Sequence, residues 1–110
     1  MAVGENSKII PKDIINKLTP VSLAYWIMDD GSFNKSKGYL ILCTDSYCKE
    51  DVLYLISILK TKFNISSALF VIKNNNKIYH RIRINKSSMP SLIGLVKPYF
   101  INSMLYKLGF

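Results

Sequence analysis

Acidic residues are absent from the second half of this 110-residue chain. All seven acids lie at or before Asp51, whereas nine lysines and arginines follow it, and the net charge is +8. A field of one sign over half of a compact domain favours a polyanionic partner. The alternatives are a basic protein kept in solution by its charge and an anionic membrane surface, which is less favoured because no basic amphipathic helix stands out.

Histidine, cysteine and long apolar runs are also scarce. His80 is the only histidine, and Cys43 and Cys48 are the only cysteines, which argues against a Cys/His metal site. We expect both cysteines to be free thiols of an intracellular protein. No apolar run reaches the roughly 18 residues that a membrane span needs, so we expect no membrane partner.

The composition, 49% hydrophobic and 20% charged, predicts one globular domain. We place a lead-in arm with a short helical turn at residues 1–18 and the domain itself at residues 19–110. Thr19 is expected to cap a helix, Pro20 to take its first position, and the helix to run over residues 21–30. Gly31 is expected to end it.

The rest of the chain alternates hairpins and helices. Residues 32–44 read as a hairpin whose polar turn ends at Gly38. Ser46 is expected to cap a second helix, with Glu50 and Asp51 near its positive start. One face of that helix carries apolar residues at helical spacing, namely Val52, Leu55, Ile56, Leu59 and Phe63. A second hairpin turns at residues 74–76.

Ser88 is expected to cap a third helix that stops before Pro98, and a short helix follows. The predicted fold is therefore an α+β domain of order α-β-β-α-β-β-α, with one antiparallel sheet and helices on one side.

The last strand of the second hairpin shows what the open face of the sheet would offer. Side chains alternate along a strand, so the residues fall into two groups. One group is Ile78, His80, Ile82 and Ile84, and the other is Lys77, Tyr79, Arg81 and Arg83. His80 thus falls on the apolar face and is expected to be a buried histidine rather than a catalytic base.

The polar group can reach phosphates or base edges. Lys73 in the preceding strand, and Asn34, Lys35 and Lys37 in the first hairpin, add to it. Two such hairpins could lie as ribbons in a major groove. An ordinary solvated face is the alternative interpretation.

The helix over residues 21–30 ends on two acids, Asp29 and Asp30. Carboxylates in the last helical turn face the negative end of the helix dipole, at a cost of about 0.3–1 kcal/mol each. A bound cation would compensate, and Mg²⁺ takes carboxylate oxygens together with backbone carbonyls. A plain turn between helix and strand is the alternative. The helix is also apolar nearly all round, which predicts a second helix against it, from another copy or another domain.

The nonapeptide "LAYWIMDDG" at residues 23–31 resembles the signature of the LAGLIDADG homing endonucleases. With "TDSYCKEDVLYL", "LVKPYF" and "MLYKLGF", it is similar to the C-terminal half of the two-motif, yeast-mitochondrial type of that family. The resemblance runs from about Ser7 to Phe110. It implies hydrolysis of double-stranded DNA with divalent metal ions, a fold whose sheet forms a DNA-binding saddle, and an intron-encoded, mitochondrial or other organellar setting. Frequent isoleucine, lysine and asparagine, whose codons are AT-rich, are compatible with that setting.

The resemblance also assigns roles. Asp30 would bind the catalytic metals with help from the Gly31 carbonyl, Lys107 and Lys8 would lie near the scissile phosphate, and Asp45 at the end of the second strand would hold water. The face that pairs two such helices would include Ala24, Tyr25, Met28 and Asp29. The third and seventh motif positions, small in many members, are here Tyr25 and Asp29.

One motif supplies one active-site half. The second half would come from a homodimer or from a non-identical half of a larger enzyme. Two other functions stay open: an RNA-splicing maturase of the same fold and a non-catalytic DNA-binding module.

Overall fold

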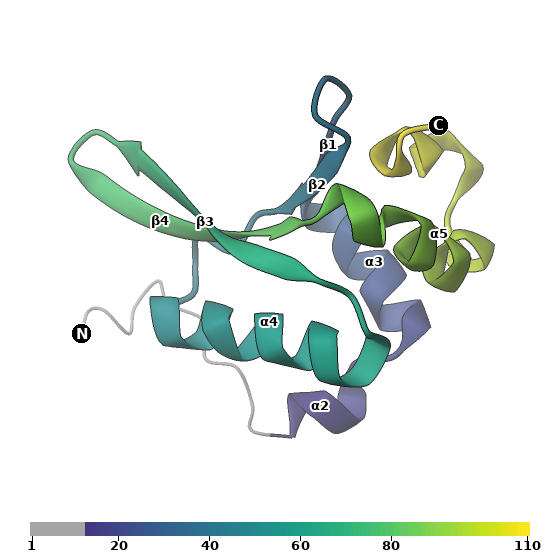
Figure 1. Cartoon of the computed structure of the whole chain (residues 1–110), viewed down its shortest axis with the longest axis horizontal. Coiled ribbons are helices and arrows are strands. Elements are labelled where there is room, and N and C mark those ends of the chain that lie inside the picture. The colour runs from purple at the N-terminus through teal and green to yellow at the C-terminus, as the bar shows by residue number, and fades with distance from the viewer. Residues whose placement is uncertain (1–12) are drawn as a thin grey trace.

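The computed structural model describes residues 13–110, which form helices on one side of a single sheet (Figure 1). In chain order the elements are α2 (Ile14–Lys17), α3 (Pro20–Asp30), β1 (Gly31–Asn34), β2 (Tyr39–Leu42), α4 (Lys49–Phe63), β3 (Ser67–Asn74), β4 (Lys77–Ile84), η1 (Lys86–Ser88), α5 (Met89–Val96), η2 (Lys97–Tyr99) and η3 (Asn102–Leu108). This confirms the predicted α+β class and the predicted order of helices and hairpins. Within residues 13–110, no helix is both long enough and apolar enough to cross a membrane.

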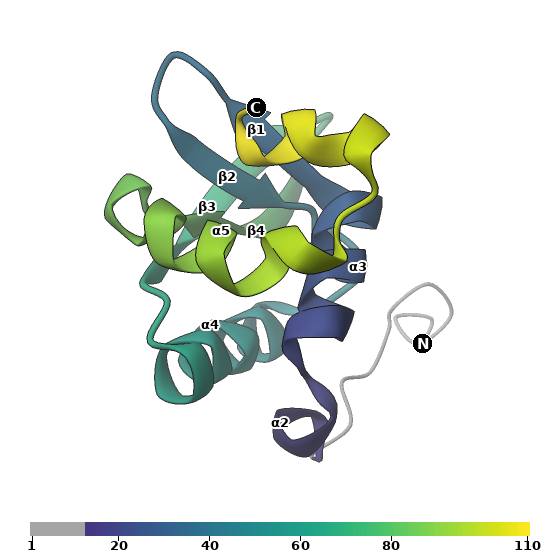
Figure 2. The ribbon, with the colours of Figure 1, turned by 90° about the vertical axis from the view of Figure 1, so that its right-hand side faces the viewer.

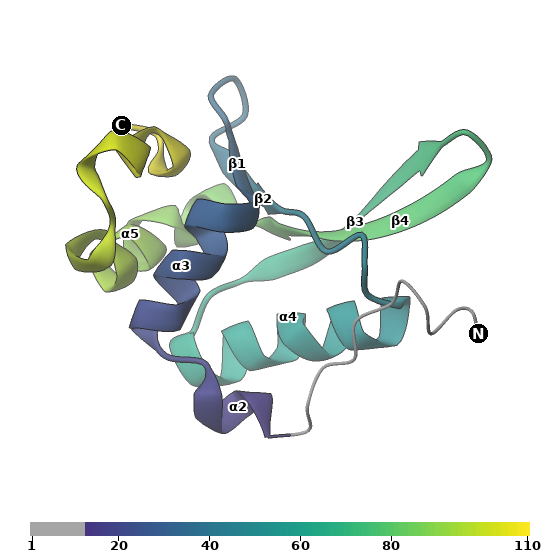
Figure 3. The ribbon, with the colours of Figure 1, turned by 180° about the vertical axis from the view of Figure 1, so that it is seen from behind.

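The four strands are antiparallel in the order β1-β2-β4-β3. Their register puts Leu40 beside Ile84 and Leu69 beside Ile82, so one face of the sheet is apolar. Figure 1 shows α4 running along that side of β3 and β4, and Figure 2 shows α3 and α5 packed together near the other end of the sheet. Both hairpin tips point away from α4 (Figure 3), so the opposite face of the sheet is open.

The core lies between the apolar face of the sheet and the three long helices. Its fully buried side chains include Leu23 and Ile27 of α3, Leu59 of α4 and Leu92 of α5. Ile58 of α4 is also buried, although the predicted apolar face of that helix omitted it. The helices therefore form one layer, which leaves the polar face of the sheet uncovered by the described residues.

The predicted start of α3 is confirmed by a reciprocal capping box. The Ser22 amide donates to Thr19 Oγ1 at 3.2 Å, and the Thr19 amide donates to Ser22 Oγ at 2.8 Å. Pro20 occupies the first turn, where its missing N–H costs nothing. Two backbone N–H groups at the start of α3 thus have partners, and the first turn of the helix is held in place.

Of the other two predicted caps, Ser46 is wrong, and Ser88 has the predicted position but makes no side-chain cap bond. Ser46 lies in a turn closed by a bond from the Tyr47 amide to the Thr44 carbonyl, so α4 begins later, at Lys49. Ser88 does precede α5, but its backbone is helical because η1 runs directly into α5, whereas a capping side chain needs extended backbone. Its hydroxyl instead accepts a bond from the Ser66 amide at 2.9 Å.

The far part of the β3–β4 hairpin extends beyond the helices (Figure 1). Ile78 is 55% exposed there and Val71 is 54% exposed. His80, predicted to be buried, is half-buried because its neighbour across the strands is the exposed Val71. Asn75 and Asn76 close the hairpin with positive φ angles of 50° and 64°, as a two-residue turn requires.

Gly31 is the residue at which α3 becomes β1. Its φ of −83° suits any residue, so the reason for glycine is space. A Cβ there would lie 2.6 Å from the Ile27 carbonyl oxygen and 2.9 Å from a methyl group of Ile27. Only glycine lets the strand leave the helix end this closely.

We predict that Gly31→Ala lowers the free energy of unfolding by roughly 1–3 kcal/mol, because backbone must move to admit the methyl group. Gly94→Ala is the matched control. Gly94 lies inside α5 with open space around it, so alanine there should raise stability by about 0.5–1 kcal/mol. Denaturant titrations followed by circular dichroism measure both. Equal effects of the two variants would contradict the packing argument.

Candidate functional site

The C-terminal end of α3 carries the two acids that the sequence singles out. Asp29 and Asp30 are the last two residues of the helix and both are exposed. The ion pairs among residues 13–110 are Lys17–Asp13 and Arg81–Asp45, so neither acid is paired within the described chain. The Asp30 carbonyl accepts a bond from the Cys43 amide at 3.0 Å, which fastens the helix end to the residue that follows β2.

The Gly31 carbonyl is a second oxygen at the same end of α3. Gly31 pairs with Leu42, and the bond from Cys43 to Asp30 marks this as a non-hydrogen-bonded pair of the antiparallel ladder. In such a pair both carbonyls point away from the partner strand. Because β1 is an edge strand, the Gly31 carbonyl receives no ladder bond from within the sheet.

Lys107 of η3 reaches the same helix end. Its ammonium donates to the Met28 carbonyl at 2.5 Å, and the side chain is half-buried. A cation on an orphan carbonyl of the last turn compensates the negative end of the helix dipole. The fold thus brings Lys107 to the helix end that carries Asp30 and Gly31, although Lys107 lies 76 positions after Gly31 in the chain. Lys8, predicted to join them, lies outside the described residues.

These groups fit one half of a magnesium site. Mg²⁺ is usually held by one or two carboxylates and keeps several waters, with substrate phosphates completing its shell. Residues 13–110 hold no cluster of three or more acid, histidine or cysteine side chains that could cage a metal alone. An exposed carboxylate and a carbonyl without a ladder bond, at one helix end, suit the more open kind of site.

The open face of the sheet collects most of the predicted nucleic-acid contacts. The register puts Arg83 beside Ile41, Arg81 beside Phe70, and Tyr79 beside Ile72, all on the face away from the helices. Lys77 and Asn34 share this face, and the Arg83 guanidinium lies 5.5 Å from the centre of the Tyr39 ring. A basic surface with aromatic rings is suited to a nucleic acid.

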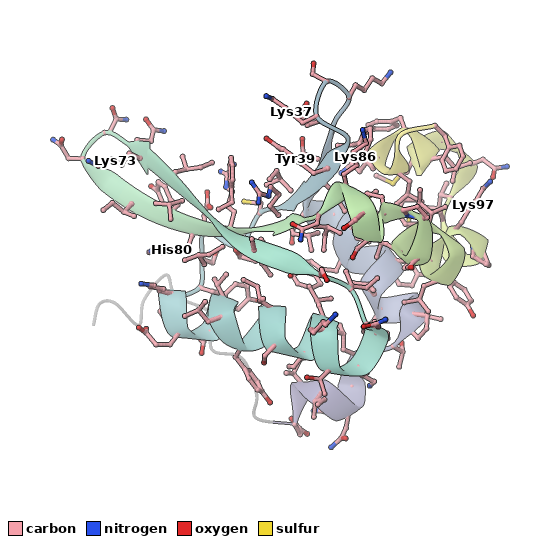
Figure 4. All side chains as sticks on the ribbon, viewed as in Figure 1. Lys37, Tyr39, Lys73, His80, Lys86 and Lys97 are labelled. Atoms are coloured by element: carbon pink, nitrogen blue, oxygen red, sulfur yellow. The ribbon has the colours of Figure 1, made fainter. Side chains whose placement is uncertain are left out.

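The remaining predicted contacts lie at the hairpin tips. Figure 4 shows Lys37 at the tip of the β1–β2 hairpin and Lys73 near the tip of the β3–β4 hairpin. The turn that holds Lys35 is closed by a bond from the Lys37 amide to Asn34 Oδ1 at 3.0 Å. Lys73 pairs with Ile78 and so alternates onto the opposite face from Arg81. It is not brought together with the arginines, although its long side chain extends past the helices.

Asp45 and Arg81 form the strongest polar contact on the open face. Arg81 Nε donates to Asp45 Oδ1 at 2.8 Å and Nη2 donates to Oδ2 at 2.7 Å. The hydrogen bond and charge of Arg81 lower the pKa of the Asp45 carboxyl, and the carboxylate raises the pKa of Arg81. Sequence reasoning gave Asp45 a water-holding role and missed this pair, whose members lie 36 positions apart.

The outward side of α3 differs from the predicted pairing face. Ala24 is fully buried and Met28 is 3% exposed, because both pack into the core of this chain. The assignment of these two residues to a pairing face is therefore corrected. Tyr25 is 56% exposed and Val21 is 40% exposed, and with Asp29 they form a row at four-residue spacing, which we call the α3 outer row.

The geometry predicts that each acid at the end of α3 is a cost to folding. We expect Asp29→Asn and Asp30→Asn each to raise the free energy of unfolding by about 0.3–1 kcal/mol, because the dipole end is negative. Glu50→Gln, in the first turn of α4, removes the same charge from a positive helix end and should lower stability by a similar amount. Thermal and denaturant unfolding at low salt measure all three. A loss of stability in Asp30→Asn would contradict the assignment.

The chain is similar to known proteins in sequence and in fold. Residues 2–92 match the model of the LAGLIDADG DNA endonuclease family. The chain is 45% identical over 94% of its length to "Cytochrome b mRNA maturase bI2" of Saccharomyces cerevisiae, and 40% identical over 96% to "Probable intron-encoded endonuclease 1" of Wickerhamomyces canadensis. It spans only 24% and 46% of those two proteins.

A solved structure, "The homing endonuclease I-WcaI bound to its DNA recognition sequence", is similar with a TM-score of 0.79 and 37% identity. The similarity covers 94% of this chain and 47% of that one. In sequence, fold and the position of its motif at the junction of helix and sheet, this chain belongs to the LAGLIDADG DNA endonuclease family.

Proposed function

We propose that this chain is one half of a site-specific DNA endonuclease that hydrolyses phosphodiester bonds with Mg²⁺. One observation carries the proposal: Asp30, the outward Gly31 carbonyl and the Lys107 ammonium meet at one helix end beside an open, basic sheet face. Names of similar proteins support it, since several are intron-encoded endonucleases and one is a homing endonuclease bound to DNA. The chain spans about half of that homing endonuclease, which is why we propose a half site.

In the proposed reaction the residues of this chain position charge. Bound Mg²⁺ would supply an activated water and neutralise phosphate charge. Asp30 and the Gly31 carbonyl would hold it at the helix end. Lys107 would place its ammonium beside the scissile phosphate while staying anchored on the Met28 carbonyl. Lys8, which the family resemblance assigns to the same region, would add a second cation. No side-chain nucleophile is required.

The open face of the sheet is the proposed DNA surface. Both hairpins curve away from the helices, so the strands form the saddle that the family resemblance implies (Figure 3). Arg81, Arg83 and Tyr79 occupy its centre, with Lys77 and Asn34 beside them. Lys35, Lys37 and Lys73 at the tips would contact phosphates at the edges. We propose residues 19–110 as the domain that binds and cuts DNA, with residues 1–18 as a lead-in. Leu18 and Ile15 pack on the domain, and the Ile15 carbonyl accepts a bond from Lys62.

The α3 outer row is the proposed contact with a second half. A second copy of this chain is the simplest occupant, with the two Asp30 carboxylates near each other across a two-fold axis. A copy would also bring Tyr25 against Tyr25 and Asp29 against Asp29. A non-identical half with small residues opposite Tyr25 avoids this, and the coverage of 47% of the similar homing endonuclease favours it.

A maturase is the second candidate function. The yeast protein that is 45% identical to this chain is named a cytochrome b mRNA maturase, which favours an intron-encoded, mitochondrial or other organellar setting. The same basic sheet face would then bind intron RNA. A non-catalytic DNA-binding module is less favoured, because a pure binder has no use for an exposed acid where phosphates approach.

The assignment of Asp30 predicts a separation of binding from cleavage. We expect Asp30→Asn to bind duplex DNA like the unmodified chain and to cut it at least about a hundredfold more slowly, because the metal loses its carboxylate. Asp29→Asn is the control and should retain cleavage. Nicking of a supercoiled plasmid library with Mg²⁺, and none with Ca²⁺, measures this. Cutting by Asp30→Asn at the normal rate would show that the metal assignment is wrong.

The α3 outer row predicts the state of assembly. If two copies pair along α3, Tyr25→Glu should raise the dimer dissociation constant by on the order of tenfold or more, because two charges would be buried at the centre of the contact. Leu53→Glu on α4 is a control of similar exposure, at 44%, and should change nothing. Sedimentation with and without duplex DNA reports the outcome. A monomer under both conditions would contradict self-pairing and leave the non-identical half.

A further inference from the structure

The Asp45–Arg81 pair has no part in the proposed hydrolysis. It is nevertheless held in place, because the residues that directly precede Asp45 and Arg81 are bonded to each other. The Thr44 side chain is 1% exposed, and its hydroxyl donates to the His80 carbonyl at 2.6 Å. This ties the segment after β2 to β4, one residue before Arg81. Asp45 is thereby set directly across from the guanidinium rather than reaching it by chance on a mobile loop.

The way the pair is made leaves one edge of the guanidinium free. Asp45 takes the edge formed by Nε and Nη2, with bonds of 2.8 and 2.7 Å. A guanidinium has five N–H donors, so both hydrogens of Nη1 and one of Nη2 are left for other partners. Two parallel donors from Nη1 and Nη2 are the arrangement that binds guanine at O6 and N7.

The charge of the pair argues for base readout rather than for phosphate binding. A carboxylate in direct contact cancels most of the attraction that the guanidinium would exert on a phosphate. The directions of the remaining N–H bonds are kept, and rotation of the long side chain is restricted. Arg83 contrasts with this, since its guanidinium lies against the Tyr39 ring and has no ion pair among the described residues.

The position of the pair places the base close to the proposed site of cutting. Asp45 follows Cys43 by two residues, and the Cys43 amide is bonded to the Asp30 carbonyl. Two residues of chain span at most about 7 Å, which corresponds to roughly two base steps of duplex DNA. Arg81 therefore faces bases near the scissile phosphate and not those at the hairpin tips.

We propose that Asp45 is a positioning residue that orients Arg81 to read one guanine within a few base pairs of the cleavage site. This inference rests on the proposed DNA-binding function, and it names a pair of residues that would give the same surface its preference for one base. It differs from the water-holding role expected from the family resemblance, because both Asp45 oxygens already accept bonds from Arg81.

The test compares base preferences on a library of duplexes with randomised sequence. The full chain is incubated with the library at several salt concentrations, and bound duplexes are sequenced. For the unmodified chain we expect a preference for guanine at one position. Asp45→Asn should reduce that preference on the order of tenfold. It should not weaken binding to other sequences, because one negative charge has been removed from a surface facing phosphates.

Three further variants make the result specific. Arg81→Lys should lose the same guanine preference, because an ammonium cannot bind in a bidentate manner. Asp13→Asn breaks the remote Asp13–Lys17 ion pair, removes the same charge and should leave every preference unchanged. Arg83→Ala should weaken binding to all sequences without erasing the preference at that position. Melting temperatures of the variants check that each is folded.

The outcomes separate this inference from the proposed function. A guanine preference that persists in Asp45→Asn overturns the positioning role, even if Arg81→Lys abolishes the preference. A similar loss in Asp13→Asn would assign the effect to net charge and would also overturn it. An unmodified chain that selects no sequence overturns the DNA-endonuclease proposal itself, and that failure is visible without any variant.

Discussion

The end of α3 is the constraint on which the functional half of this domain depends. The helix stops with its carbonyls pointing at the junction between helix layer and sheet, and three contacts hold that junction. Gly31 allows β1 to leave within van der Waals distance of Ile27, the Cys43 amide binds the Asp30 carbonyl, and the Lys107 ammonium binds the Met28 carbonyl. Each contact uses backbone rather than side-chain carboxylate. The carboxylates of Asp29 and Asp30 therefore take part in none of these three contacts.

The same junction links the end of α3 to Arg81 on the open sheet face through a very short segment. Cys43 contacts the helix end, Thr44 contacts β4 and Asp45 contacts Arg81, in three consecutive residues. A displacement of the sheet would reach the helix end through these three residues, because each is bonded to one of the elements concerned. Contiguity along the chain thus brings Arg81 of the open sheet face into the neighbourhood of the acid that we assign to the metal.

Local pattern allowed most of the fold to be predicted, because the local signals agree with one another. Alternation in β4, helical spacing in α4 and the cap at Thr19 all appear in the structure as expected. The caps predicted at Ser46 and Ser88 show where local signals stop. Ser88 has the right residue type in the right place, but the preceding turn fixes its backbone and Ser66 takes its hydroxyl. Residue type limits which hydrogen bonds a side chain can make, whereas its tertiary neighbours determine which of those bonds forms.

The candidate site was predictable only where one residue carried the signal. Asp30 and Gly31 adjoin in the motif, and Lys107 came from the family resemblance. The Asp45–Arg81 pair was not predictable, because nothing local marks two residues 36 positions apart as partners. Ala24 and Met28 were misassigned for a related reason: a helix that is apolar all round does not reveal which side its own core occupies. Only the packing of Leu23 and Ile27 beside them settles this.

The acids of this chain differ in whether a positive charge or a positive helix end faces them. Six of the seven acids lie within residues 13–110, and four of these are compensated there. Asp13 pairs with Lys17, Asp45 pairs with Arg81, and Glu50 and Asp51 lie at the positive end of α4. Asp29 and Asp30 alone face a negative helix end, without a paired cation in the described chain. In a protein with so few acids, these two lie at a helix end where Lys107 neutralises part of the dipole but pairs with neither carboxylate, so a cation from outside the chain still has negative charge to neutralise there.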